Sequence, residues 1–143
     1  MANGRSQIMM VILAACLLGG CSSGPTAVPY AREYPAAIKQ AETLDIQVFR
    51  RTTHIEFTNT TARAFGPCTL WLNRRFNRPI DGLAVGQTMD IKLDDFRDEY
   101  SAAFRGGGFF STEAPDKLVQ AQLEITDAEG KGVLVGLVVV GGN

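Results

Sequence analysis

From residue 44 onward, apolar and polar side chains alternate along much of the chain, which is the pattern of β-strands with one buried face. Leu44, Ile46 and Val48 share one face of the first such stretch, and the alternation resumes with Ile55 and Phe57 after a short polar break. These two stretches predict a β-hairpin. Further strands are predicted over residues 68–73, 80–83, 88–93, 119–125 and 133–140.

The rest of the pattern shows almost no helical period, so the domain is predicted to be all-β. Six to seven short strands separated by turn signals favour an antiparallel sandwich of two sheets, with a small barrel as the alternative. The layout resembles an immunoglobulin-like module. The cysteine pair of that module is missing here, so the resemblance concerns the architecture alone.

The beginning of the chain has a different pattern. Residues 1–7 are mostly polar, and residues 8–18 are all apolar or cysteine, which is typical of a secretory signal. The sequence Leu18-Gly19-Gly20-Cys21 that follows resembles the lipobox of bacterial lipoproteins. The alternative is an ordinary secretory peptide, or a buried N-terminal helix, that happens to end in Gly-Gly-Cys.

The lipobox resemblance implies that the chain is cleaved before Cys21, and that Cys21 carries a lipid on its sulfur and an acyl group on its new amino terminus. Two or three acyl chains make such an anchor effectively permanent, so the membrane is the first predicted partner. Ser22 follows, whereas lipoproteins kept at an inner membrane usually have Asp there. The resemblance therefore implies a lipid-anchored protein of the outer membrane, on its periplasmic face or at the cell surface.

These patterns predict three parts of the chain: a signal peptide over 1–20, the lipidated cysteine and a linker over 21–43, and a β-sandwich domain over 44–143. Three prolines among small and polar residues favour an extended linker. A linker of this kind would lift the domain about 40 Å above the lipid.

The composition narrows the class of protein further. The chain has 143 residues, 14 basic against 15 acidic side chains and 45% apolar residues, which suits one globular domain. Without a basic excess, a nucleic-acid partner is not expected. No apolar run reaches the roughly 18 residues that a membrane-spanning helix needs. No cofactor is predicted.

Cys68 is the only free thiol expected in the mature chain, because Cys16 is removed with the signal and Cys21 carries the lipid. Its position after Gly66-Pro67 favours a small buried residue at the start of a strand. The alternative is a nucleophile activated by His54, the only histidine. His54 is out of phase with its apolar neighbours and should face solvent, which disfavours this pair.

An acidic run offers a second candidate for chemistry. Asp94, Asp95, Asp98 and Glu99 could supply carboxylate oxygens to Ca²⁺, although their spacing matches no EF-hand loop. The alternative is a solvated turn in which Asp94 or Asp95 caps one helical turn. The alternative to a non-catalytic function is therefore that the protein is a small enzyme that uses Cys68 or this acidic run.

Charge is unevenly distributed along the chain. Residues 50–78 hold six arginines against one glutamate, whereas residues 79–143 hold five basic and eleven acidic side chains. Arg74, Arg75 and Arg78 are therefore candidates for binding an anionic envelope polymer, such as lipopolysaccharide phosphate, or an acidic envelope protein. The alternative is that the arginines pair with the acidic half of the same domain.

Two phenylalanines, Phe109 and Phe110, follow the triple glycine 106–108. In an extended backbone neighbouring side chains point to opposite faces, so one ring should be exposed and available to a partner. The alternative is that the loop curls and both rings cap the open end of the sandwich.

Taken together, these patterns predict a lipid-anchored, non-catalytic domain that binds or holds another envelope component. The stretch from Ile55 to Ile125 is also similar to small bacterial envelope lipoproteins without an assigned function. That resemblance rests on three short motifs, which are Thr69-Leu70-Trp71-Leu72-Asn73, Leu83-Ala84-Val85-Gly86-Gln87-Thr88 and Phe96-Arg97-Asp98-Glu99.

Overall fold

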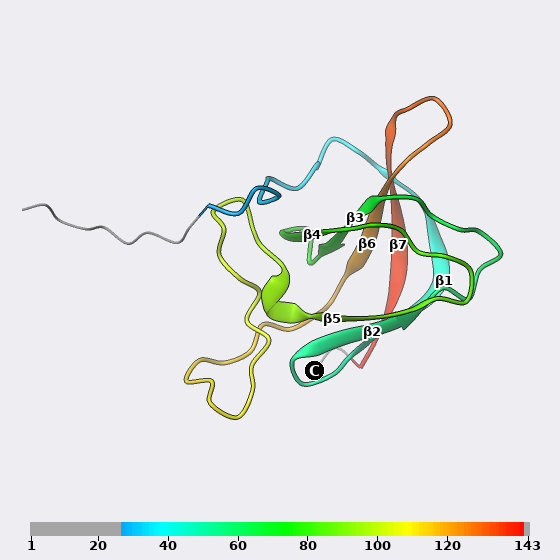
Figure 1. The fold of residues 1–143 in the computed structure, drawn as a ribbon. Coiled ribbons are helices and arrows are strands. Elements are labelled where there is room, and N and C mark those ends of the chain that lie inside the picture. Colours follow the sequence, from blue (N-terminus) through cyan, green and yellow to red (C-terminus); the bar gives the residue numbers. More distant parts are fainter. Residues whose placement is uncertain (1–26, 142–143) are drawn as a thin grey trace, which may run out of the picture.

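The computed structural model describes residues 27–141, so Cys21 and the predicted signal peptide lie outside the described residues. Seven strands make up the domain (Figure 1). They are β1 (Gln40–Arg50), β2 (His54–Thr58), β3 (Cys68–Leu72), β4 (Phe76–Ile80), β5 (Thr88–Lys92), β6 (Ala121–Thr126) and β7 (Gly132–Val140).

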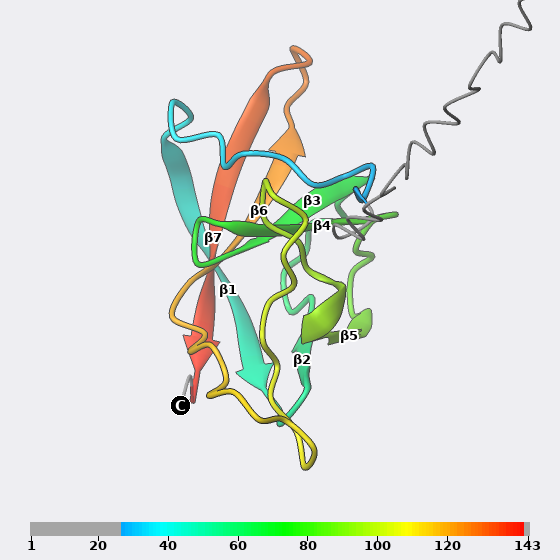
Figure 2. The same ribbon diagram turned by 90° about the vertical axis from the view of Figure 1, so that its left-hand side faces the viewer.

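All seven strands belong to one sheet, in the order β4-β3-β6-β7-β1-β2-β5. Neighbouring strands are antiparallel except β1 and β7, which pair in parallel. The sheet curls into half a barrel (Figures 1 and 2). The all-β class is confirmed, whereas the expected antiparallel sandwich of two sheets is replaced by one mixed sheet.

This difference has a physical reason. Alternation along a strand shows that one of its faces is buried, and a second sheet or the same sheet curled over itself can bury that face equally well. The parallel pairing of β1 with β7 joins the two ends of the domain, and no turn signal in the sequence indicates a contact of that range. The predicted β1–β2 hairpin is confirmed by its antiparallel pairing.

The fourth strand lies at 76–80 instead of the expected 80–83. Asn73 and Arg74 both have positive φ, 52° and 55°, and are the central residues of a tight turn that the Arg75 N–H closes on the Leu72 carbonyl at 3.1 Å. This turn places β4 directly against β3. Pro79 is tolerated because β4 is an edge strand, where a missing N–H leaves no gap in the ladder.

The core fills the concave side of the curled sheet. Trp71 is excluded from it, because Leu70 and Leu72 point inward and Trp71 points outward, as the alternation predicts. Loop residues close the open side of the half-barrel, among them Phe96 and Phe104. The buried apolar residues of the strands in this core include Leu44, Ile46, Val48, Ile55, Phe57, Leu70, Leu72, Phe76, Ile80, Ile91, Leu123, Val135 and Leu137.

Residues 27–39, expected to be part of an extended linker, run along the outer side of the sheet; we call them the N-terminal segment. Trp71 is 0% exposed although it lies on the outer face, because this segment covers it. Tyr34 meets the indole edge-on at 5.3 Å between ring centroids, and the Arg32 guanidinium lies 4.8 Å from the ring centroid. The indole Nε1 donates a hydrogen bond of 2.7 Å to Glu124, which also pairs with Arg32.

The helical content is minimal. Within residues 27–141, the only helical element is the 3-10 turn η1 (Leu93–Asp95). Accordingly, none of the described residues form a helix with the length and apolar character needed to cross a membrane.

Candidate functional site

The loop between η1 and β6 projects from the body of the domain and carries Phe109 and Phe110 at its tip (yellow in Figures 1 and 2). The Ser111 amide donates to the Gly108 carbonyl at 3.1 Å, which closes a turn with the two phenylalanines as its central residues. Phe109 is 95% exposed and Phe110 is 91% exposed. Their rings meet each other edge-on, with centroids 5.0 Å apart. We call residues 106–112 the aromatic tip.

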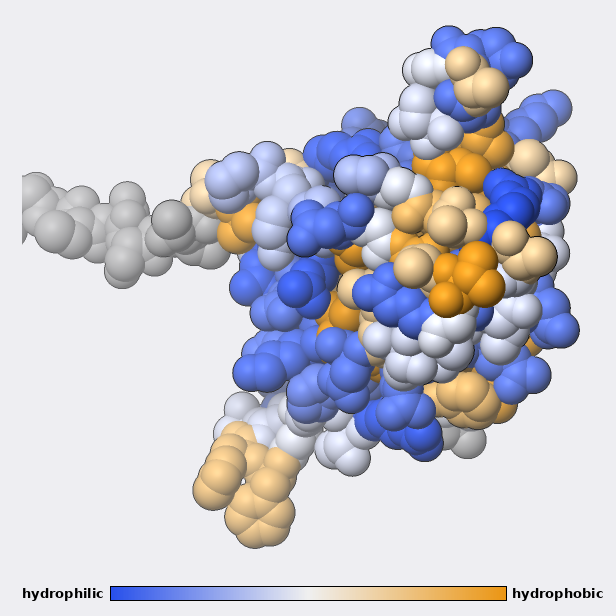
Figure 3. Space-filling view, turned by 45° about the vertical axis from the view of Figure 1, so that its right-hand side comes forward, coloured by the Kyte–Doolittle hydropathy of each residue, from blue (hydrophilic) through white to orange (hydrophobic). Residues whose placement is uncertain are grey.

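The expected exposure of one ring is confirmed, and the second ring is exposed as well. The alternative, in which both rings cap the core, is wrong, because neither ring packs into the core. The alternation argument applies to extended backbone, whereas residues 109 and 110 form a turn. Figure 3 shows the result, an apolar projection that stands clear of the polar surface around it.

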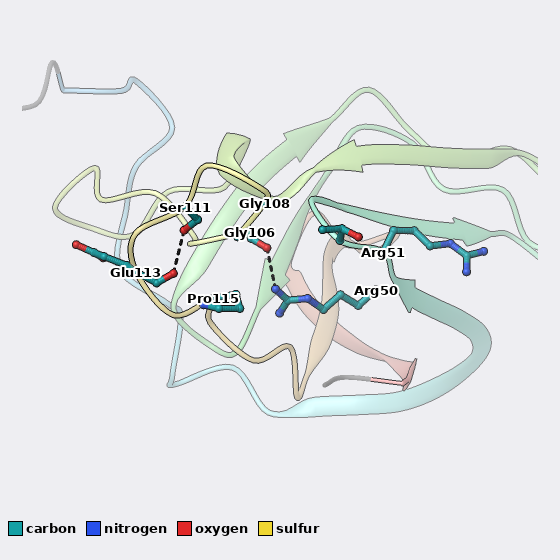
Figure 4. Close-up of a pocket in the computed structure, with 9 residues that line it drawn as sticks. Arg50, Arg51, Gly106, Gly108, Ser111, Glu113 and Pro115 are labelled. Atoms are coloured by element: carbon teal, nitrogen blue, oxygen red, sulfur yellow. Dashed lines mark hydrogen bonds between the residues drawn. The ribbon is translucent and has the colours of Figure 1, made fainter.

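The base of the loop is held by ionic and polar contacts. Arg105 binds Asp116 through its guanidinium, at 2.5 Å and 3.0 Å, and through its backbone N–H at 2.9 Å. These hydrogen bonds hold the pKa of the Asp116 carboxyl below its usual range. Arg50, at the end of β1, donates to the Gly106 carbonyl at 3.0 Å (Figure 4) and also to the Asp116 carbonyl. The two ends of the loop are therefore bound to each other through Arg105 and Asp116, and to strand β1 through Arg50.

Backbone conformation and close packing account for the three consecutive glycines at 106–108. Gly107 and Gly108 have φ of 84° and 134°, a backbone region that side chains with a Cβ rarely adopt. A Cβ on Gly107 would also lie 3.0 Å from the Pro115 side chain. Gly106 packs closely as well, because a Cβ there would approach the Leu93 Cβ to 3.2 Å.

A cleft of about 660 Å³ opens beside the loop and is lined by the glycines, Arg50, Arg51 and Glu113. Figure 4 shows the Arg51 guanidinium directed away from the glycines, and it pairs with Glu56 at 2.8 Å. Arg50 does face the glycines, but it donates to backbone carbonyls there. Arg50 therefore supports the aromatic tip through hydrogen bonds to the backbone at its base.

The three arginines predicted to bind an anionic partner lie on the turn before β4 and on β4 itself. Arg75 pairs at 2.7 Å with Asp98, whose side chain is 1% exposed, and Arg78 pairs at 3.2 Å with Asp95. Arg74 lies 5.1 Å from the centroid of the Tyr34 ring. Arg75 and Arg78 thus match the alternative in which arginines pair with the acidic half of the domain, and Arg74 contacts the N-terminal segment.

The proposed catalytic pair does not come together. His54 is on β2 and Cys68 is on β3, and these strands are not neighbours in the sheet. The His54 Nδ1 lies 2.8 Å from the Thr53 hydroxyl, while Cys68 is buried, as the sequence predicted. Burial raises the pKa of the Cys68 thiol to about 11, so the thiolate form is rare at neutral pH.

Cys68 is consequently expected to be inert in the folded protein. With Cys16 and Cys21 replaced by serine, every thiol adduct reports Cys68, and a thiol-reactive dye should label the protein only after denaturation. The measurement is the labelling rate at pH 7.5 in buffer and in guanidinium chloride. Equal rates under both conditions would contradict the burial of Cys68 and revive the enzyme hypothesis.

The acidic run is dispersed over the turn η1 and the loop after it. Asp98 accepts hydrogen bonds from the backbone N–H groups of Tyr100 and Ala102 as well as from Arg75. No side chain caps η1, so the predicted aspartate cap is absent there. Among the described residues, no group of three or more His, Cys, Asp or Glu side chains is arranged to hold a metal ion.

Sequence reasoning missed the groups that build the aromatic tip. Arg50 was considered only as part of a positive block, and Arg105 and Asp116 carried no motif. Arg105 and Asp116 are eleven positions apart in the sequence, and no periodic signal marks a loop closed by an ion pair.

Comparisons with protein-family models, curated proteins and solved structures found no match for this chain.

Proposed function

We propose that this protein is a lipid-anchored, non-catalytic envelope domain that contacts another envelope component through its aromatic tip. The observation that carries the proposal is the exposure of both Phe109 and Phe110 on a loop held at its base. Exposure of two large apolar side chains to water does not stabilise the domain, and these rings take no part in the packing of its core. Their placement is accounted for by contact with a partner.

The two alternatives from the sequence have less support. An enzyme based on Cys68 would need a thiolate and a neighbouring base, whereas Cys68 is buried and on a different part of the sheet from His54. Recognition of an anion by Arg75 or Arg78 would have to displace Asp98 or Asp95. The aromatic tip needs no such rearrangement to meet a partner.

Anchoring through Cys21 is the first part of the proposal to test. Cys21→Ser should move the protein from the membrane fraction to the soluble fraction or leave it unprocessed, because the sulfur that takes the lipid is lost. Fractionation of cells carrying either form, with intact-mass measurement of the wild-type protein, checks this. A wild-type N-terminus other than an acylated Cys21 would rule out the anchor.

The contact through the aromatic tip is tested separately in intact envelopes. A photo-crosslinking phenylalanine analogue at position 110 should form adducts with an envelope component. The matched control is the same analogue at Val85, which is 57% exposed on the loop between β4 and β5. Equal adduct yields at the two positions would contradict a role for the tip.

A further inference from the structure

Three segments lie along one side of the domain, the first two near one end of that side and the third near its other end (Figures 1 and 2). They are the start of the N-terminal segment, the loop 98–102 and the aromatic tip, which form the left edge of the molecule in Figure 1 and lie toward the viewer in Figure 2. The Val28 backbone N–H donates to the Ser101 hydroxyl at 3.1 Å, so the start of the segment touches the second loop. Tyr100, in the same loop, is 75% exposed.

We infer that this side of the domain rests on the lipid bilayer, with Phe109 and Phe110 inserted at the level between headgroups and acyl chains. The inference rests on the proposed anchoring at Cys21 and names the bilayer itself as the component that the tip contacts.

The length of the chain before residue 27 supports this orientation. Because residues 27–39 pack on the domain, only the backbone from Cys21 to residue 27 separates the proposed lipid from the folded protein. A chain of that length spans at most about 20 Å when fully extended. An anchor at Cys21 would therefore hold the side of the domain that carries residue 27 within that distance of the bilayer surface, and the aromatic tip is on the same side.

The chemistry of the tip also suits a lipid surface. Residues 106–112 are seven consecutive uncharged residues, so their transfer toward the acyl chains removes no charge from water. The first charged side chains, Arg105 and Glu113, pair with each other at 3.3 Å at the base of the loop. That position is where polar headgroups would surround them.

A bilayer fits the shape of the tip better than a protein pocket does. Stable protein interfaces bury roughly 800 Å² on each partner, with an apolar centre inside a polar rim. Here two rings stand alone on a projection, and the residues beside them are glycine, serine and threonine. A lipid surface requires only that apolar groups extend beyond the polar surface of the domain, which Figure 3 shows.

The strength of the contact explains why an anchor is needed. Full burial of one phenylalanine side chain changes a partition constant by about one to two orders of magnitude. Two rings without a tether would bind vesicles only marginally, as a single acyl chain does. A lipid at Cys21 makes insertion an intramolecular step at an effective concentration of the order of millimolar, so the rings then set the orientation of the domain.

The test uses the full-length, lipidated protein reconstituted in phosphatidylethanolamine–phosphatidylglycerol vesicles whose acyl chains carry bromine. Phe110→Trp places a fluorophore at the tip. Val85→Trp is the matched control, on the loop between β4 and β5, which lies away from the left edge of the molecule in Figure 1; the buried Trp71 signal is subtracted with the wild-type protein. Brominated lipid should quench the tryptophan at 110 at least about twofold and leave the one at 85 unchanged. Equal melting temperatures of the variants and the wild type show that the fold is intact.

The outcomes separate the two proposals. Intact mass of the same sample reports acylation of Cys21, and a protein without the lipid contradicts the proposed function together with this inference. An acylated protein whose tryptophan at 110 is quenched no more than the one at 85 overturns the bilayer contact alone. Adducts of the position-110 crosslinker with protein instead of lipid likewise overturn it and identify a protein partner, which leaves the proposed function standing.

Discussion

Replacing Trp71 with alanine is expected to lower the free energy of unfolding by about 3–5 kcal/mol. The indole is fully buried between the sheet and the N-terminal segment, and its removal leaves a cavity that Tyr34 and Arg32 border on one side. It also leaves Glu124 without the indole hydrogen bond. Because small domains are stable by only about 5–15 kcal/mol, this loss is a large part of the total.

The change in the free energy of unfolding is measured by urea denaturation monitored by circular dichroism, which does not depend on the fluorescence of the tryptophan that is replaced. The matched control is Val119→Ala, an exposed position just before β6, which should change the stability by no more than about 0.5 kcal/mol. Trp71→Phe keeps one ring but removes the indole donor and part of the buried ring system, so it should cost about 1–3 kcal/mol, less than Trp71→Ala. A loss below about 1 kcal/mol for Trp71→Ala would mean that the N-terminal segment does not cover the sheet in solution.

Loss of the Asp98 carboxylate is the second large effect expected. Asp98→Ala should lower the free energy of unfolding by about 3 kcal/mol, because two backbone N–H groups and Arg75 lose their acceptor. This value is at the low end for a broken buried pair, since the Arg75 side chain is 61% exposed and stays hydrated. Arg78→Ala is the control, because its more exposed pair with Asp95 should contribute less than about 1 kcal/mol.

The same carboxylate makes the stability depend on pH. Burial raises the pKa of Asp98, but the hydrogen bonds from Arg75, Ala102 and Tyr100 outweigh it, so the pKa in the folded protein lies below its ordinary value. A lowered pKa contributes stability that is present above the unfolded pKa of about 4 and is lost as the pH falls through the folded pKa. The stability difference between the wild type and Asp98→Asn should therefore shrink from about pH 5 to about pH 2. A difference that stays constant over this range would show that Asp98 is not held ionised by these contacts.

Within the sheet, local pattern was enough to find most strands and their buried faces. Leu70 and Leu72 point into the core and Trp71 points outward because side chains alternate in any strand, whatever its partners. Burial of Cys68 was also predictable from its neighbours. The position of β4 was not, because the turn at Asn73 and Arg74 uses positive φ without glycine, which gives no strong sequence signal.

The aromatic tip was only half predictable. The triple glycine and the two phenylalanines marked an unusual loop, and exposure of one ring was expected from alternation. Exposure of both follows from the turn closed between Gly108 and Ser111 and from the ion pair of Arg105 with Asp116, which hold the loop away from the core. These contacts join residues that no local period connects.

The amino-acid sequence by itself determined that the domain is all-β, which face of most strands is buried, and that the chain begins with a pattern resembling a lipoprotein signal. These features depend on interactions between near neighbours, whose spacing the sequence states directly. Only the tertiary structure decided that the strands form one curled sheet with parallel β1 and β7 paired in its interior, that residues 27–39 cover Trp71, and that Phe109 and Phe110 both project. Each of these depends on which distant segments meet, and that choice is made by the packing of the whole core and not by any local pattern.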